Sequence, residues 1–132
     1  MTHPFRAAVE AGDAGAMADA LADDVVFRSP VVYKPYHGRE ATMQLLSFVV
    51  QVFDDFEYVD ELHGEDSICL VFRAQAGGRE LHGIDHLRLD EHGKVIELTV
   101  MIRPLSGLTA VAEAMRAKLE AAGLAPEPAP ST

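Results

Sequence analysis

Residues 81–104 read LHGIDHLRLDEHGKVIELTVMIRP, and this stretch decides the fold. Turn-forming residues at positions 90–93 divide it into two arms, so it predicts two long strands joined in a hairpin. On the first arm apolar and polar residues roughly alternate, as is typical of a strand with one covered face. The second arm is apolar at almost every position from 95 to 102, which indicates that both of its faces are covered.

Asp85 is the unusual residue of this stretch, because it is an acid in the middle of a predicted strand. Its neighbours on the same face are small or apolar: Gly83, Leu87 and Leu89. A buried carboxyl group must be paired, protonated or functional. We therefore interpret Asp85 as an acid that points into a pocket. The alternative is a structural acid that pairs with Arg28 or Arg73, or that faces an interface.

The charge balance of the chain limits its partners. The 132 residues include 11 Lys and Arg against 21 Asp and Glu, which gives a net charge of −10 with no basic run. This composition argues against a surface for nucleic acid or for an anionic membrane. No apolar run approaches the roughly 20 residues of a membrane span, and no basic segment followed by an apolar core begins the chain. We expect a cytoplasmic protein whose partner is a small molecule or another protein.

The length fits a single domain, which we place at residues 1–122, and the Pro- and Ala-rich residues 123–132 predict a disordered tail. The single cysteine, Cys69, lies in an apolar strand-like run and is interpreted as a small core residue. His82 and His86 would stand about 13 Å apart along a strand, too far to share a metal ion held at about 2 Å. We therefore expect no metal site and no cofactor.

The remaining elements follow in a simple order. Residues 4–21 predict two short helices, with Gly12 ending the first and Asp13 capping the second. A strand from Val25 is closed by Pro30, an irregular segment covers residues 31–39, and a helix spans residues 40–53. Strands at 56–62 and 67–74 lead through a Gly-Gly hairpin into residues 81–104, and Ser106 caps a last helix that ends at residue 123.

This order predicts an α+β fold, in which helices gather on one face of a curved antiparallel sheet. Such a sheet wraps around the helices as a cone, and the open end of the cone is a natural apolar pocket. The period of two along the strands predicts the pocket wall, with Val71, Arg73 and Met101 on the opposite face. The predicted wall residues are Phe27, Leu70, Phe72, Leu98, Val100 and Ile102.

Other side chains could complete the pocket. The irregular segment carries Tyr33, Tyr36 and His37, which we take as candidate catalytic partners of Asp85. The alternatives are that the two tyrosines pack on the helix below and that His37 is a turn residue. Three further residues are expected to contact a ligand: Phe5, Ser29 and Tyr58.

Several short motifs carry a family resemblance over roughly residues 3–105. They are AGD at 11–13, LADD at 21–24, YHGR at 36–39 and GKVI at 93–96. In this order they resemble the nuclear transport factor 2-like superfamily of cone-shaped α+β domains. Residues 84–89, IDHLRL, are similar to ketosteroid isomerases and to SnoaL-like polyketide cyclases. The resemblance implies a domain that binds a polyketide-, steroid- or terpenoid-like molecule. The alternative is a non-catalytic domain that binds a ligand or a protein.

The isomerase resemblance can be followed residue by residue. The family places its general base, an Asp, directly before a proline, and here Ser29 precedes Pro30. A tyrosine of the family's oxyanion site is replaced by Phe5, whereas its protonated aspartate corresponds to Asp85. Steroid isomerisation of that kind is therefore not expected, because Ser29 cannot carry the proton. Another isomerase, cyclase or lyase reaction through Asp85 stays open.

Residues 95–102 also predict an interface. Leu98, Val100 and Ile102 share one face of the predicted strand, and Thr99 and Met101 occupy the other. An isolated monomer would expose apolar surface on one side of the sheet. We therefore expect a homodimer formed through the back of the sheet.

Overall fold

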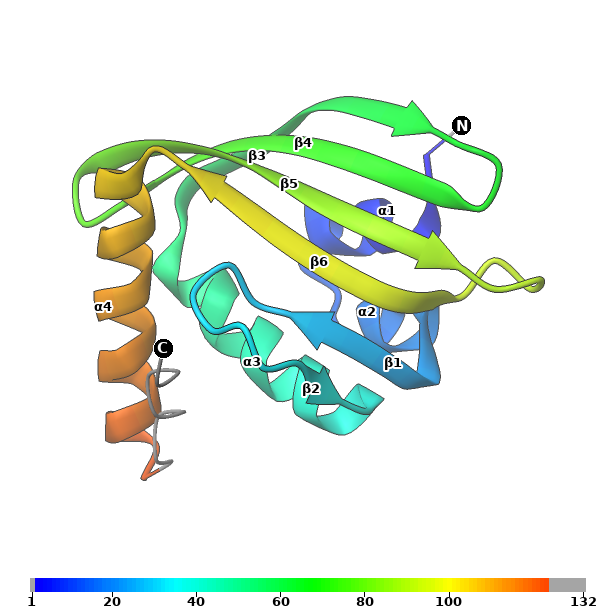
Figure 1. Cartoon of the computed structure of the whole chain (residues 1–132), viewed down its shortest axis with the longest axis horizontal. Helices are drawn as coiled ribbons and strands as arrows, with labels where there is room; N and C mark the ends of the chain where they lie inside the picture. Colours follow the sequence, from blue (N-terminus) through cyan, green and yellow to red (C-terminus); the bar gives the residue numbers. More distant parts are fainter. Residues whose placement is uncertain (1, 124–132) are drawn as a thin grey trace.

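The protein folds as an α+β cone (Figure 1), seen in a computed structural model that describes residues 2–123. Its helices are α1 (Pro4–Ala11), α2 (Ala14–Ala20), α3 (Arg39–Val52) and α4 (Leu105–Ala121). Its strands are β1 (Leu21–Arg28), β2 (Tyr36–His37), β3 (Asp54–His63), β4 (Ser67–Ala76), β5 (Arg79–Leu89) and β6 (Val95–Arg103). The predicted fold class is confirmed. Residues 124–132, most of the predicted tail, lie outside the described residues.

The strands form one curved sheet in the order β2-β1-β6-β5-β4-β3. The strands β3 to β6 pair antiparallel in sequence order, as predicted. Two features of the sheet were not predicted from the sequence. Strand β1 pairs parallel to β6, and the short strand β2 adds an antiparallel edge to β1. Both are pairings that hydrophobic periodicity within a strand cannot reveal.

The N-terminal helices meet at the predicted joint. Gly12 adopts a left-handed conformation with φ of 67°, which ends α1. Asp13 caps α2, because its carboxylate accepts a hydrogen bond of 3.0 Å from the backbone N–H of Ala16. His3 caps α1 by accepting from the Phe5 N–H, and its Nε2 lies 3.0 Å from the Gly93 carbonyl oxygen. Helix α1 is therefore attached to the β5–β6 turn.

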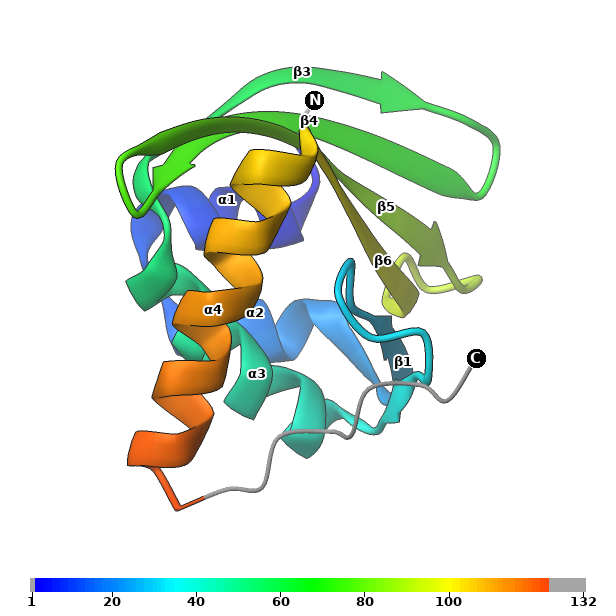
Figure 2. The same cartoon turned by 60° about the vertical axis from the view of Figure 1, so that its left-hand side comes forward.

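Helices α1, α2 and α3 lie on the concave side of the sheet (Figure 1). Helix α4 runs across one end of the cone and packs against α3 and the strands β4, β5 and β6 (Figure 2). The core between these layers is apolar, and its most buried members come from helices and strands alike: Phe5, Leu21, Val25, Leu70, Phe72, Leu87 and Leu98. None of the helices in the described part of the chain is long and apolar enough to span a membrane.

The structure corrects the predicted start of the first strand and the predicted cap of the last helix. Strand β1 begins at Leu21 rather than Val25, because an irregular register with β6 between Leu21 and Val26 admits two exposed acidic residues. Ser106 does not cap the last helix, since α4 already begins at Leu105 with Pro104 in the capping position. Ser106 lies within the first turn of α4.

Candidate functional site

The cone encloses a cavity of about 870 Å³. Its walls are apolar side chains from the N-terminal helices, α3, α4 and the concave face of the sheet. The charged residues of the lining are Glu10, Glu57, Asp85, Glu113, Arg116 and Glu120. All of them except Asp85 are exposed, whereas Asp85 is 8% exposed. The described lining therefore has a single buried charged group.

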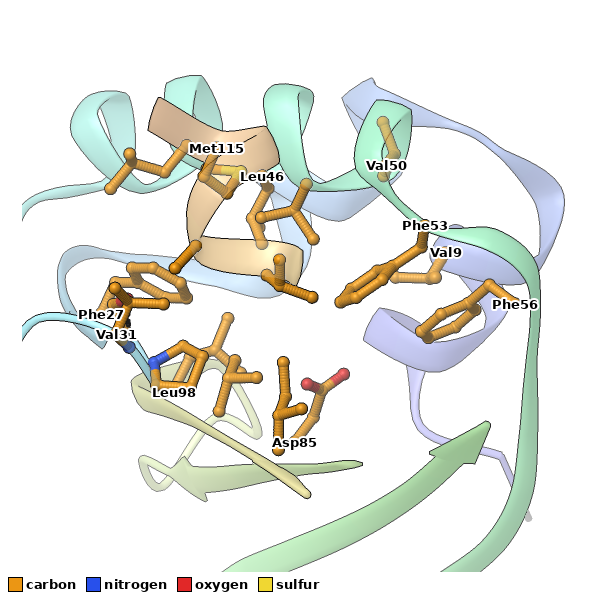
Figure 3. A pocket seen from close by; sticks show the side chains of 18 of the residues that line it. Val9, Phe27, Val31, Leu46, Val50, Phe53, Phe56, Asp85, Leu98 and Met115 are labelled. Carbon is orange, nitrogen blue, oxygen red and sulfur yellow. Dashed lines mark hydrogen bonds between the residues drawn. The ribbon is translucent and has the colours of Figure 1, made fainter. Parts of the chain in front are cut away.

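Strand β5 directs Asp85 into the cavity. Its side chains alternate between buried and more exposed positions, and Asp85 lies on the buried, concave face. The carboxyl group points towards the centre of the cavity, between aliphatic residues and the phenylalanines of the opposite wall (Figure 3). The prediction that Asp85 faces inward is confirmed.

Tyr58 is the hydrogen-bond partner of Asp85. Its hydroxyl donates to Asp85 Oδ2 over 2.8 Å, and the hydroxyl and the carboxyl are both buried. The alternative pairing with an arginine is wrong, because Arg28 pairs with Glu97 at 3.6 Å and Arg73 is exposed on the opposite face of the sheet. We call Tyr58 and Asp85 the acid pair.

Burial governs the ionisation of the acid pair. Desolvation raises the pKa of Asp85 to about 7 from its ordinary 3.8, although the hydrogen bond from Tyr58 opposes this shift. Burial also raises the pKa of Tyr58 far above its ordinary value, and the negative charge of Asp85 adds to this effect. Near neutral pH, Tyr58 is thus a neutral donor, and Asp85 is neutral in a large fraction of the molecules.

Strand β3 brings Tyr58 into this position through an irregular register. Its pairing with β4 shifts between Asp54 and Glu57 and again between Tyr58 and Asp60. Tyr58 is 8% exposed, whereas its neighbours Glu57 and Val59 are exposed. The sequence predicts Tyr58 in the pocket wall but places the candidate partners of Asp85 in residues 31–39. The pair cannot be read from the sequence, because β4 separates β3 from β5 and periodicity gives no contact across an intervening strand.

An aromatic cluster supports the acid pair. Phe56 lies 4.9 Å from Tyr58 and 4.9 Å from Phe72 between ring centroids, and Phe53 lies 5.6 Å from Phe56. The ring of Phe72 lies against Gly83, where an added Cβ would stand 2.1 Å from Phe72 Cζ. Gly83 therefore leaves room for this ring beside Asp85.

Most predicted pocket residues line the cavity. They are Phe5, Phe27, Ser29, Tyr36, Tyr58, Asp85, Leu98, Val100 and Ile102. Two predicted wall residues are not part of the lining: Leu70 is completely buried in the core, and Phe72 lies in the aromatic cluster. They share the concave face, but neighbouring side chains separate them from the cavity.

Two of the three loop candidates lie outside the cavity. Tyr33 is 89% exposed and His37 is exposed, and neither belongs to the lining. The reason for His37 is strand β2, which pairs Tyr36 with Phe27 and His37 with Val26. Alternation along β2 turns Tyr36 towards Phe27 in the cavity, with ring centroids 6.3 Å apart, and turns His37 to solvent.

Ser29 directly follows β1, at the position where the isomerase resemblance implies a general base. Its hydroxyl oxygen accepts a hydrogen bond of 3.0 Å from the backbone N–H of Val31 and so holds the turn after the strand. Phe5 contributes a buried ring without a hydroxyl group. The site thus combines an apolar cavity with the acid pair, and it has no carboxylate at the position of Ser29.

Comparison with known proteins identifies the family. The SnoaL-like domain matches residues 3–98, which is more than half of the chain. The chain belongs to the SnoaL-like domain family. No curated protein gives a significant match to this SnoaL-like domain.

Solved structures agree with this assignment. A steroid delta-isomerase from Pseudomonas aeruginosa is 38% identical, with a TM-score of 0.85 over 89% of this chain and 88% of that one. An uncharacterised bacterial protein with a cystatin-like fold from Silicibacter pomeroyi is 30% identical, with a TM-score of 0.84 over 89% and 83% of the two chains. A hypothetical protein with a ketosteroid isomerase-like fold from Catenulispora acidiphila, at 14% identity and a TM-score of 0.62 over 83% and 89% of the two chains, shares the fold alone.

Proposed function

We propose that this SnoaL-like domain binds a small, largely apolar molecule in its cone, and that the neutral carboxyl group of Asp85 donates a hydrogen bond to an oxygen atom of that molecule. The observation that carries the proposal is Asp85 itself, a buried acid with a pKa of about 7 that points into an apolar cavity of about 870 Å³. Tyr58 donates to one carboxyl oxygen of Asp85, so the proton of the neutral carboxyl group is left for an acceptor atom of the ligand.

Charge narrows the class of ligand. Four of the five exposed charged residues of the lining are acidic, and the whole chain carries a net charge of −10. This field disfavours anionic ligands such as fatty acids or acyl phosphates. A neutral ketone, with the rigid apolar body of a polyketide, steroid or terpenoid, fits both the acidic surroundings and the donor in the cavity.

The acid pair also supports acid–base chemistry. Removal of a proton next to a carbonyl group places negative charge on the carbonyl oxygen, and a preorganised donor stabilises that charge. An acid with a pKa near 7 is suited to proton transfer at neutral pH. The 38% identity to a protein named as a steroid delta-isomerase favours a carbonyl compound as ligand. Ser29 in place of a carboxylate argues against the proton transfer of that family. We therefore propose an isomerase, cyclase or lyase step in which the ionised fraction of Asp85 takes the proton and the acid so formed returns it.

Two matched probes test the binding proposal. The probe 2-acetylnaphthalene carries a carbonyl oxygen, whereas 2-ethylnaphthalene has nearly the same apolar body without it. At pH 5, where Asp85 is protonated, we expect the ketone to bind about 2- to 10-fold more tightly, as one hydrogen bond of about 0.5–1.5 kcal/mol would give. The preference should decline as the pH rises through about 7.

Two variants make the test specific. Asp85→Leu should remove the preference for the ketone while 2-ethylnaphthalene still binds, and the matched exposed substitution Asp24→Asn should leave both affinities unchanged. Equal affinities of the wild type for the two probes at pH 5 would contradict the proposed role of Asp85.

We also propose that the domain forms a homodimer through the outer face of the sheet. Val71, Ile84 and Met101 lie in one cross-strand row on that face, and Met101 is 55% exposed. Burial of this apolar row would favour association. Sedimentation should show a dimer of the 14.3 kDa chain, which Met101→Glu dissociates and the control Leu105→Glu does not. A wild-type monomer at micromolar concentration would contradict this proposal.

A further inference from the structure

Arg6 on helix α1 lies next to the acid pair without lining the cavity. Its guanidinium carbon stands over the ring of Tyr58, 5.6 Å from the ring centroid. We propose that Arg6 is a positioning residue. It holds Tyr58 in the orientation that donates to Asp85 and so sets the strength of the hydrogen bond between the two side chains. This inference deepens the proposed function and rests on it for the effect on ligands.

Two carboxylates fix the guanidinium group. Arg6 Nη1 lies 3.0 Å from Glu61 Oε1, and Arg6 Nε lies 3.3 Å from Glu10 Oε2. Glu61 is in turn contacted by His63 Nε2 at 2.5 Å. Although burial opposes ionisation of Glu61, the hydrogen bonds from Arg6 and His63 outweigh it and lower its pKa. The ionised Glu61 side chain is 9% exposed, so it anchors Arg6 from a position with little freedom.

The ring of Tyr58 is constrained by different kinds of contact. Phe56 and Phe72 meet it with interplanar angles of 85°, and the cation of Arg6 lies over its ring. A guanidinium group over an aromatic ring is attracted by the negative charge of the ring face. Without Arg6, the two phenylalanines would remain, but the ring would lose this cation. The hydroxyl group would then be free to move relative to Asp85.

Arg6 also acts on the hydroxyl through its charge. The ionisable groups near the acid pair include Arg6 and Glu10 from α1, with Glu61 and His63 of β3 behind Arg6. Cys69 of β4 is another, since burial and the charge of Asp85 raise the pKa of its thiol. After burial, the negative charges of Asp85 and Glu10 raise the pKa of Tyr58, and Arg6 is the group that lowers it. A more acidic hydroxyl is a stronger donor, and the bond it donates lowers the pKa of Asp85. Loss of Arg6 should therefore raise the pKa of Asp85.

The sequence context explains why this chain uses such an arrangement. Phe5 replaces the tyrosine that the isomerase resemblance implies on the first helix, so α1 supplies no hydroxyl group to the site. Strand β3 supplies one instead, from Tyr58. The residue directly after Phe5 is Arg6, and it connects α1 to this substitute hydroxyl. Helix α1 thus contacts the acid pair through Arg6 rather than through a hydroxyl group of its own.

The test compares Arg6→Gln with the control Arg28→Gln, which removes an arginine–glutamate pair on the outer face of the sheet. Two measurements are made on the folded proteins: the carboxyl titration of Asp85 by ¹³C NMR, and the affinity ratio of 2-acetylnaphthalene to 2-ethylnaphthalene at pH 5. Arg6→Gln should raise the titration midpoint of Asp85 and lower the affinity ratio towards one, with 2-ethylnaphthalene binding unchanged. Arg28→Gln should change neither measurement.

The Tyr58→Phe variant, as a second background for Arg6→Gln, shows whether Arg6 acts through Tyr58. When Tyr58→Phe is already present, Arg6→Gln should shift the Asp85 midpoint much less than it does in the wild type. A folded Arg6→Gln protein with the wild-type midpoint and ratio would overturn the inference. So would an equal shift in the two backgrounds.

Two further outcomes keep the test decisive. If Arg6→Gln does not fold, Arg6→Lys is used, which keeps the charge but loses the planar guanidinium group. A smaller rise of the Asp85 titration midpoint in this variant supports the inference. A wild-type midpoint and affinity ratio overturn it. If the wild type itself does not prefer the ketone, the proposed function fails. The Asp85 titration alone then supports or overturns the role of Arg6.

Discussion

Tyr33, in the segment of residues 29–38 between β1 and α3, and Tyr58, on strand β3, lie in opposite environments. Tyr33 is 89% exposed, whereas Tyr58 is 8% exposed and donates to Asp85. The segment is held to the sheet by the two residues of β2, while β3 pairs with β4 along most of its length. The partner of the buried acid therefore comes from a packed strand with an irregular register, and not from the exposed part of the segment between β1 and α3.

The largest expected effect concerns the pH dependence of stability. The pKa of Asp85 is about 7 in the folded protein against 3.8 for the free side chain, so the folded state binds the proton more tightly. The stabilisation that the bound proton gives the folded state is fully present below about pH 4 and is lost as the pH rises to about 7. Above that pH the contribution of Asp85 to stability no longer changes. The slope should approach about 1.4 kcal/mol per pH unit. Urea unfolding between pH 4 and pH 8 measures it.

Asp85→Asn is the matched variant for that prediction, because it keeps the shape of the side chain and removes its titration. Other groups, including Glu61, contribute equally to both proteins, so the difference between the two stability curves isolates Asp85. Parallel curves for the wild type and the variant would show that Asp85 does not have the raised pKa on which the acid pair depends.

A comparably large effect is expected from Gly83→Ala, which disturbs the aromatic cluster on the β3 side. The added Cβ would stand 2.1 Å from Phe72 Cζ, so the ring must move. Overpacking of this kind costs about 1–3 kcal/mol in the free energy of unfolding. In the control Gly15→Ala, the new Cβ meets its nearest atom, Asp13 Oδ1, at 3.5 Å. Wild-type stability of Gly83→Ala would indicate that the cluster is loosely packed.

An effect of similar size is expected from Tyr58→Phe, which leaves the carboxyl group of Asp85 without its donor. An unsatisfied buried group costs about 1–3 kcal/mol, and the cost should be greater at pH 8, where Asp85 is ionised, than at pH 5. The carboxyl titration of Asp85 should also move to higher pH, because the Tyr58 hydrogen bond lowers the pKa. Equal destabilisation at both pH values would mean that the hydroxyl does not serve the charged form.

The smallest effects are expected in the segment before α3. Tyr33→Phe and His37→Ala change exposed side chains that do not line the cavity. Such surface substitutions usually alter stability by no more than about 0.5 kcal/mol. Neither should change the relative affinity for the two naphthalene probes. A marked loss of ketone binding in either variant would show that the segment before α3 contributes to the site, contrary to this comparison with β3.

The sequence was sufficient for features that depend on local patterns. Gly12 and Asp13 determine the joint between α1 and α2 because a left-handed residue and a side-chain cap are local requirements. The period of two places Asp85 on the concave face of β5 and Met101 on the convex face of β6. The cone and its apolar cavity follow from these patterns together with the family motifs.

The sequence was insufficient where strands far apart in the chain must meet. The hydroxyl of Tyr58 reaches Asp85 across β4, and two register shifts in β3 decide where Tyr58 lies. The parallel pairing of β1 with β6 cannot be read from either strand alone. Tyr36 and His37 seemed equivalent in the sequence, and the pairing of β2 with β1 separates them into a cavity residue and a surface residue.

The parallel pairing of β1 with β6 has a consequence for the kinetics of folding. It joins Phe27 to Leu98, two cavity residues that are far apart in the chain, whereas β3 to β6 form hairpins between neighbours. Closing so long a loop is entropically costly, so the hairpins should form first and the cavity last. A bound molecule then stabilises contacts that are absent from the transition state. Stopped-flow measurements with 2-acetylnaphthalene should therefore show slower unfolding and an unchanged rate of refolding.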